Sequence, residues 1–259
     1  MSKHLLTSRS AVHLMHQCIP FCSAANISPQ IPIHFQAAAD ESSVAACPLT
    51  HQVRMICKLK NIEPLIMPFN IQKKSKEFLE INSTGKVPVL VHQLNPDEAL
   101  VLDDPLLIAK YLEERFPNPP IRSNNREAIV AGSNIFQKFC ALIKNNDPAK
   151  DRGLQSALLK KLEELNSFLL GSDSSFMESD SLRFSDCSLL PKLLLVRVAA
   201  KELKGLEIPG KFEGVWDYIH AGEKQVVFRD TCPSDELIKE HWSRKFATVP
   251  LLEGYERKL

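Results

Sequence analysis

The 259-residue sequence has no apolar run long enough to cross a membrane. A spanning helix needs about 20 mostly apolar residues. Residues 10–39 contain no Asp, Glu, Lys or Arg, but they carry Pro20, Pro29 and Pro32 and many polar side chains. The sequence therefore predicts a soluble, cytoplasmic protein.

The sequence also lacks an excess of either charge and any regular spacing of cysteines. With 32 Lys and Arg against 31 Asp and Glu, the formal net charge is +1, which gives no electrostatic reason to expect nucleic acid as a partner. The cysteines are odd in number and irregularly spaced, so they predict a reducing compartment rather than a disulfide framework. None has the neighbours that a zinc site needs, and we expect no metal. The seven are Cys18, Cys22, Cys47, Cys57, Cys140, Cys187 and Cys232.

Acidic residues are absent from the N-terminal stretch before Asp40, which contains Lys3, Arg9 and several Ser and His residues. Two interpretations of this stretch stay open, a disordered tail and a mitochondrial transit peptide. The prolines favour the tail, and we predict that residues 1–30 are disordered.

The chain is long enough for two domains, and 44% of its residues are hydrophobic. Between residues 31 and 116, short β-like apolar runs alternate with helix-period segments. This order predicts an α+β, thioredoxin-like domain. Its expected strands are 31–35, 64–71, 87–94 and 99–102, and its expected helices are 49–59, 73–81 and 105–115.

Residues 117–121 are rich in proline and predict a stiff linker. The remainder, 122–259, has helix-period apolar positions and no convincing strand alternation, so we expect an all-helical domain. Its expected helices are 128–144, 153–170, 185–203 and 212–227, with a mobile loop at 171–180.

Cys47 is the strongest candidate for chemistry, because the segment Cys47-Pro48-Leu49-Thr50 follows an apolar run and opens a predicted helix. A thiol at a helix N-terminus lies against unpaired N–H donors and the positive end of the helix dipole, which favours the thiolate. Further along, Pro88 directly precedes a predicted strand. A helix-capping thiol combined with such a proline is typical of a thioredoxin-like active site.

Longer motifs resemble the glutathione transferase superfamily and, within it, the chloride intracellular channel family. The segment 78–90, FLEINSTGKVPVL, resembles the transferase pattern around its cis-proline. The segment 47–52, CPLTHQ, is similar to a Cys-Pro-Phe-Ser-Gln motif of the channel family, and 186–193, DCSLLPKL, nearly repeats another of its signatures. The resemblance covers roughly residues 31 to 246. It implies a thioredoxin-like N-terminal domain followed by an all-α, glutathione transferase-like C-terminal domain.

The resemblance implies glutathione-dependent thiol–disulfide exchange on a small disulfide substrate. Cys47 would be the nucleophile, and Thr50 occupies the place of the second cysteine of a dithiol enzyme, so that its hydroxyl could hydrogen-bond the thiolate. Cys47 and Pro48, the backbone of Val87 and a cis Pro88 would contact glutathione.

Two positions depart from the pattern of the relatives. Transferases have an acid or amide followed by Ser at a helix start that receives the γ-glutamyl group, whereas this chain has Asp104 and Pro105. Proline offers neither a hydroxyl nor an N–H, which weakens the expected grip on glutathione. Asp104 could contact the γ-glutamyl amine or could simply cap its helix. The partner cysteine of the relatives falls on Asn82, so the intramolecular disulfide proposed for some of them cannot form there.

Other interpretations stay open. The family resemblance implies a membrane-associated, anion-conducting form with lipid as a partner, in which the segment from Cys47 to about Ile71 would span and Arg54 would face a pore. The charges of that segment make it a poor lone spanner. The alternative is a non-catalytic scaffold, which the Asp104-Pro105 change favours; its protein partners are not identified by the sequence. His51 could support the thiolate or be an exposed side chain, and Cys187 and Cys232 are expected to be structural.

Overall fold

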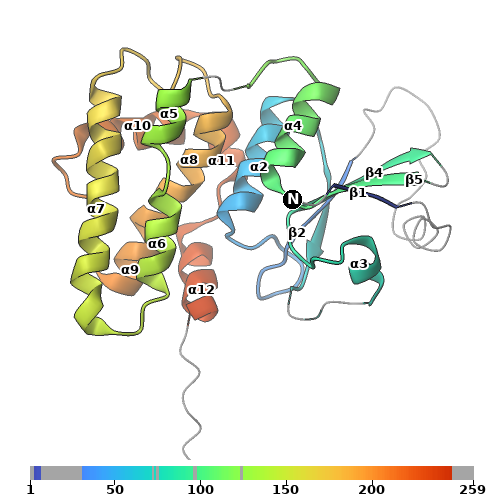
Figure 1. The fold of residues 1–259 in the computed structure, drawn as a ribbon, viewed down its shortest axis with the longest axis horizontal. Coiled ribbons are helices and arrows are strands. Elements are labelled where there is room, and N and C mark those ends of the chain that lie inside the picture. The colour runs from blue at the N-terminus through green and yellow to red at the C-terminus, as the bar shows by residue number, and fades with distance from the viewer. Residues whose placement is uncertain are drawn as a thin grey trace, which may run out of the picture.

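The computed structural model describes residues 3–6, 31–71, 73, 76–95, 98–122 and 125–246. The chain folds into a sheet part and a helical part that lie side by side (Figure 1). Helices α2 and α4 stand between the sheet and the helices of the second part (Figure 1). The predicted fold class, a thioredoxin-like domain followed by helices, is confirmed.

The sheet has five strands in the order β1-β5-β4-β2-β3. Only the β2–β3 pair is parallel, and the pairs β2–β4, β4–β5 and β1–β5 are antiparallel. The bounds are Lys3–Leu6 for β1, Pro32–Gln36 for β2, Leu65–Phe69 for β3, Val89–Asn95 for β4 and Glu98–Leu102 for β5.

Strand β1 stands where the sequence predicted a disordered tail. Lys3 pairs with Leu102 and Leu6 with Ala99, so β1 supplies the edge strand beside β5. Backbone pairing with an existing edge stabilises a segment whose own sequence signal is weak. The rest of the predicted tail lies outside the described residues.

The two faces of the sheet are covered by different helices. Leu90 and Leu102 pack with α2 (Pro48–Leu59) and α4 (Pro105–Arg115). Val89 and Val91 point to the other face, where Phe78 of α3 (Lys76–Ile81) covers them. This two-sided burial follows from the alternation of side chains along a strand.

The described residues of the helical part form more helices than the sequence predicted. The expected helix 128–144 is divided near Asn134, whose φ of 63° cannot continue an α-helix, and the last helix, α12, was not predicted. The bounds are Arg126–Ala131 for α5, Ile135–Ile143 for α6, Pro148–Leu170 for α7, Phe184–Leu195 for α8, Val196–Ala200 for the π-helical segment η1, Lys201–Lys204 for α9, Glu213–Lys224 for α10, Val226–Thr231 for α11 and Asp235–Phe246 for α12.

The loop expected to be mobile, 171–180, is anchored in the core. The side chains of Phe176 and Met177 are buried, and the Met177 amide donates to the Asp186 carboxylate at 3.0 Å. The same carboxylate accepts from the Tyr218 hydroxyl at 2.9 Å. The Asp of the 186–193 motif therefore joins this loop to α8 and α10.

A buried lysine fixes the segment between the two parts. The ammonium of Lys60, at the end of α2, donates to the carbonyl oxygens of Phe116 and Pro119 at 2.7 and 3.0 Å. It also pairs with the Glu113 carboxylate at 2.5 Å, and its side chain is 0% exposed. The proline-rich linker is thereby held against α2.

Candidate functional site

Cys47 occupies the N-cap of α2, and Pro48 is in the first turn of the helix. The thiol is partly exposed, and its sulfur makes no capping hydrogen bond within the part of the chain that the structure describes. Pro48 suits this position because it has no N–H to leave unpaired there. The cysteine therefore stands at the end of the helix where the N–H groups of the first turn have no intrahelical partner.

Thr50 lies one turn into α2, and its side chain is almost fully buried. Its hydroxyl oxygen has no hydrogen-bond partner among the described residues. A buried hydroxyl without a partner is costly, and this one lies three residues after the thiol at the N-cap.

His51 is buried, which contradicts the interpretation of an exposed side chain. Burial, assisted by the nearby charge of Arg54, lowers its pKa from 6.5 to about 3, although a hydrogen bond with the Phe228 backbone opposes the shift. The imidazole is therefore neutral at physiological pH. It offers no positive charge to the Cys47 thiolate.

The peptide bond between Val87 and Pro88 is cis, as the resemblance implied. The turn before it is held by Asn82, whose side-chain amide donates to the Lys86 carbonyl at 2.7 Å. The Thr84 hydroxyl lies 2.8 Å from Oδ1 of Asn82 and 2.6 Å from Oδ2 of Asp103, and these two acceptors share its one proton. Asn82 thus organises this turn at the position to which the resemblance assigned a partner cysteine.

The topology brings the start of α2, Pro88 and the start of α4 to one end of the sheet. Strand β4 begins next to the end of β2, because Val89 pairs with His34. Strand β5 ends next to the start of β4, because Leu102 pairs with Leu90. A hydrogen bond of 2.6 Å from Thr84 to Asp103 ties the two neighbouring turns together.

Asp104 is engaged as the N-cap of α4. One carboxylate oxygen, Oδ1, accepts from the amides of Leu106 at 2.8 Å and Leu107 at 3.2 Å. Capping therefore explains why an Asp stands here. Its second oxygen, Oδ2, takes no part in this cap.

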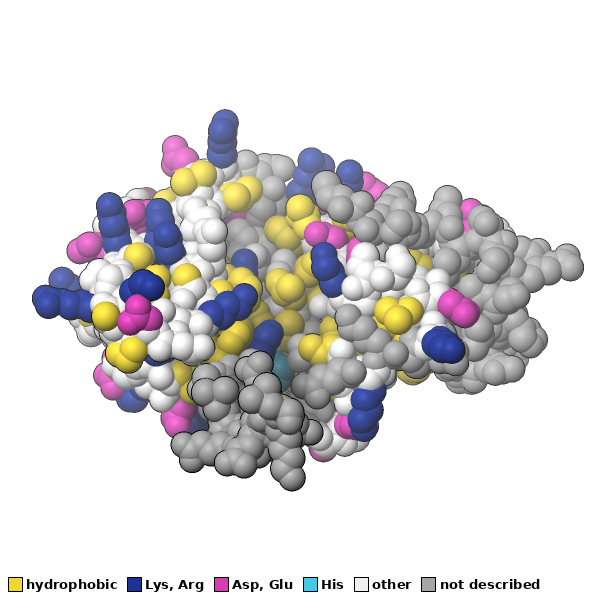
Figure 2. All heavy atoms as spheres, turned by 60° about the horizontal axis from the view of Figure 1, so that its bottom comes forward, with side chains coloured by type: hydrophobic (Ala, Val, Ile, Leu, Met, Phe, Trp, Pro, Cys, Tyr) yellow, Lys and Arg dark blue, Asp and Glu magenta, His cyan; other side chains and the backbone are white. Residues whose placement is uncertain are grey.

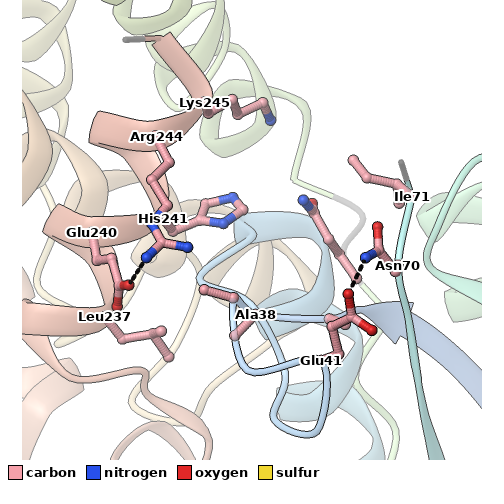
Figure 3. Close-up of a pocket in the computed structure, with 12 residues that line it drawn as sticks. Ala38, Glu41, Asn70, Ile71, Leu237, Glu240, His241, Arg244 and Lys245 are labelled. Atoms are coloured by element: carbon pink, nitrogen blue, oxygen red, sulfur yellow. Dashed lines mark hydrogen bonds and ion pairs between the residues drawn. The ribbon is translucent and has the colours of Figure 1, made fainter. Parts of the chain in front are cut away.

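A polar pocket lies between the loop that follows β2 and helix α12. Its volume is about 330 Å³, which suits a small molecule. His241, Arg244 and Lys245 of α12 line one side, and Glu41 and Asn70 face them across the cavity (Figure 3). The sequence reasoning missed these residues of α12. A usable signal was the apolar pair Ile238 and Trp242 at helical spacing.

The remaining described cysteines differ in environment. Cys57 and Cys187 are buried, and burial raises the pKa of the Cys57 thiol to about 12 and that of Cys187 further. Cys140 and Cys232 are partly exposed, and burial raises the pKa of both thiols. Cys18 and Cys22 lie outside the described residues.

Arg54, for which the sequence left a pore-facing role and a solvated helix face open, donates to the Thr231 carbonyl at the end of α11, at 3.2 Å. No helix in the described ranges has the length and apolar character to cross a membrane. On the face shown in Figure 2, hydrophobic side chains gather between the two parts of the molecule, with Lys and Arg side chains around them.

Comparisons with known proteins agree with this architecture. Residues 42–120 match the family model of the glutathione S-transferase N-terminal domain. A Chlamydomonas reinhardtii dehydroascorbate reductase superposes with a TM-score of 0.73 and 25% identity, over 84% of this chain and 99% of that one.

Two further solved structures share the fold. The CLIC homologue EXC-4 from C. elegans has a TM-score of 0.71 and 19% identity, over 85% of this chain and 88% of that one. A glutathione S-transferase from the Antarctic clam Laternula elliptica has a TM-score of 0.63 and 18% identity, over 83% of this chain and 94% of that one. The chain therefore has the glutathione transferase fold.

Proposed function

We propose that this protein is a glutathione-dependent thiol oxidoreductase with Cys47 as its catalytic thiol. The observation that carries the proposal is the partly exposed thiol at the N-cap of α2, one turn from the buried hydroxyl of Thr50, which has no hydrogen-bond partner among the residues that the structure describes. The positive end of a helix favours the thiolate of a cysteine at this position, which is the nucleophilic form, and we propose that the Thr50 hydroxyl donates to it once the thiolate forms.

The proposed cycle uses one protein thiol and two molecules of glutathione. The Cys47 thiolate attacks one sulfur of a disulfide, the S–S bond breaks, and the first thiol leaves after taking up a proton. A glutathione thiolate then attacks the Cys47 sulfur and releases the second thiol. A second glutathione attacks the glutathione sulfur, which releases glutathione disulfide and restores the Cys47 thiolate.

Glutathione would lie along the end of the sheet that holds Pro88. The backbone of Val87, which lies outside the β2–β4 ladder, would pair with its peptide portion. Asp104 would meet the γ-glutamyl amine with its free oxygen, whereas Pro105 offers no donor to the γ-glutamyl carboxylate. We therefore expect weaker glutathione binding than in a transferase that has Ser at this position.

The oxidised substrate is a small disulfide or dehydroascorbate. The second compound is suggested by the name of the Chlamydomonas relative, which matches over most of both chains. Its reduction to ascorbate takes two electrons and two protons, and two glutathione thiols supply these as they form glutathione disulfide. With dehydroascorbate the Cys47 thiolate would add to a carbonyl carbon, whose oxygen takes up a proton, in place of attacking a sulfur. A glutathione thiolate would then attack the Cys47 sulfur, break the C–S bond and release ascorbate, and a second glutathione would restore the Cys47 thiolate as glutathione disulfide leaves.

The test is the glutathione-dependent reduction of bis(2-hydroxyethyl) disulfide and of dehydroascorbate by the purified protein and by Cys47→Ser. The matched control is Cys232→Ser, because Cys232 is also a partly exposed thiol. We expect turnover that is lost in Cys47→Ser and kept in Cys232→Ser. Absence of turnover in the unmodified protein, or full activity in Cys47→Ser, would refute the proposal, and the first result would favour a scaffold.

A further inference from the structure

Val87 presents two free backbone groups at the end of the sheet. The residue directly precedes Pro88 and stands outside β4, which begins at Val89. Neither its N–H nor its carbonyl oxygen hydrogen-bonds to any residue that the structure describes, and Val87 is partly exposed. A backbone donor and acceptor on one residue can pair with the backbone of a peptide ligand, as at the edge of a sheet.

The peptide group that carries the Val87 N–H is held by the side chain of Asn82. The amide nitrogen Nδ2 of Asn82 donates to the Lys86 carbonyl oxygen at 2.7 Å. Because this carbonyl and the Val87 N–H belong to one planar trans peptide group, they point in opposite directions and turn together. The hydrogen bond from Asn82 therefore sets the direction of the free N–H.

Thr84 holds the other backbone group of Lys86. Its hydroxyl oxygen accepts from the Lys86 amide at 3.3 Å and lies 2.6 Å from Oδ2 of Asp103, in the turn before α4. Gly85, between Thr84 and Lys86, has a φ of 61°, a conformation that glycine adopts without strain. The N–H and the carbonyl of Lys86 are thus both fastened by side chains of the same turn.

Asn82 is suited to this role because it is buried and carries an amide donor. The residue is 1% exposed, so water does not compete for its hydrogen bond with Lys86. A cysteine, which the resemblance assigned to this position, offers only a weak donor. In this chain the position therefore serves the backbone before Pro88 and not a second thiol.

We propose that Asn82 and Thr84 are positioning residues that fix Val87 for the peptide portion of glutathione. The inference rests on the proposed thiol chemistry and gives these two side chains a part in it. A donor and acceptor that are already fixed reduce the ordering cost of binding a peptide. Within the described ranges neither side chain hydrogen-bonds to Cys47, so they should act on the affinity for the peptide and not on the reactivity of the thiol.

The experiment measures the alkylation of Cys47 by iodoacetamide with and without S-methylglutathione, which has the peptide of glutathione but no free thiol. Mass spectrometry of the fragment that contains Cys47 separates its rate from those of the other cysteines. In the unmodified protein, S-methylglutathione should slow the alkylation. In Asn82→Ala the concentration that gives half-protection should rise about five-fold, as for the loss of one hydrogen bond, while the rate without S-methylglutathione is kept.

The matched control is Asn166→Ala, which removes another buried amide side chain. Asn166 accepts from the Val215 amide at 3.2 Å in the helical part, and its loss should leave half-protection unchanged. Thr84→Val replaces a partly buried side chain by one of the same shape without the hydroxyl. It should weaken protection in the same direction, and it decides the question if Asn82→Ala does not fold.

Unchanged half-protection in the folded variants, or no protection in the unmodified protein, would overturn the inference. A change of the same size in the alkylation rate without S-methylglutathione would show a structural role only and would overturn it as well. Cys47-dependent turnover of a disulfide would support the proposed function in each of these cases, so the two failures are distinguishable.

Discussion

The indole Nε1 of Trp242 donates a hydrogen bond of 3.0 Å to the carbonyl oxygen of Ala46, the residue before Cys47. The two residues are 196 positions apart in the chain. The indole packs edge-on against Phe139 of α6, with ring centres 5.0 Å apart. The last helix of the helical part is therefore fastened directly to the segment that presents the thiol.

We expect Trp242→Phe to reduce both stability and activity. The substitution leaves the buried Ala46 carbonyl without its donor, which should lower the free energy of unfolding by about 2 kcal/mol. Urea denaturation and disulfide-reductase kinetics measure the two effects. Trp216→Phe is the control, because the Trp216 indole donates to the Pro209 carbonyl at 3.2 Å, in a loop of the helical part. If Trp216→Phe loses stability but keeps its kcat/KM, a lower kcat/KM in Trp242→Phe is due to the lost contact with Ala46. An unchanged kcat/KM in Trp242→Phe would contradict the prediction.

Thr50→Val should lower the reactivity of Cys47, because it removes the one hydroxyl expected to donate to the thiolate. A hydrogen bond to a charged group contributes about 1.5–3 kcal/mol, so the rate of alkylation by iodoacetamide at neutral pH should fall at least several-fold. Thr50→Ser keeps the hydroxyl and should retain most of the reactivity. Equal alkylation rates in the Val and Ser variants would show that the hydroxyl does not act on the sulfur.

Lys60→Met should destabilise the protein strongly. It would leave the Glu113 carboxylate and the carbonyls of Phe116 and Pro119 without the ammonium that they share. Removal of one partner of a buried pair costs about 3–5 kcal/mol. Lys58→Met is the control on the same helix, because Lys58 pairs with Asp230 at the surface, where such pairs contribute about 1 kcal/mol or less. Comparable losses in the two variants, measured by urea denaturation, would rule out the special role of Lys60.

The buried His51 should make the protein sensitive to acid. Its pKa in the folded state is lowered from 6.5 to about 3, so between these values the unfolded chain binds a proton that the folded chain does not. His51 should therefore cause no change in the free energy of unfolding with pH above pH 6.5. Below pH 6.5, this residue alone should lower the free energy of unfolding by about 1.4 kcal/mol for each pH unit.

The measurement is the free energy of unfolding between pH 7 and 5. The slope should be smaller in His51→Gln than in the unmodified protein, whatever the absolute stability of the variant. The exposed His220 provides the control, and His220→Gln should retain the full slope. His34 and His241, whose pKa values burial lowers to about 4, add to the same acid sensitivity. An identical slope in His51→Gln would contradict the prediction.

The sequence predicted most of the sheet part because its signals are local. The apolar run that begins the segment 87–94 and the capping Asp104-Pro105 pair each mark an element within a few residues, and the structure has β4 and α4 there. Strand β1 gave no such signal, because Lys3–Leu6 is short and is stabilised by its partner β5. The division of the helix at Asn134 depends on a backbone conformation that its sequence only weakly favours.

The candidate site was predictable only in its N-terminal half. Cys47, Thr50 and Pro88 belong to short motifs whose chemistry is understood, and such motifs can be recognised from the sequence alone. The pocket brings residues 36–41 together with residues 237–245. No hydrophobic pattern in the sequence indicates that these two distant segments meet. The Asp186 motif could be recognised, but that its carboxylate holds the amide of Met177 and the hydroxyl of Tyr218 is visible only in three dimensions.

Helix α2 packs against the sheet and α4 on one side and against α8 on the other. Its buried residues form one continuous core with both parts. The proline-rich linker divides the sequence into two folds. Because the two folds share one core, we expect them to unfold together. A cut after residue 116 would expose the apolar surface of α8 and of α2 together. We expect heat to melt the intact chain in a single cooperative transition, in which the thiol site is lost together with the last helix.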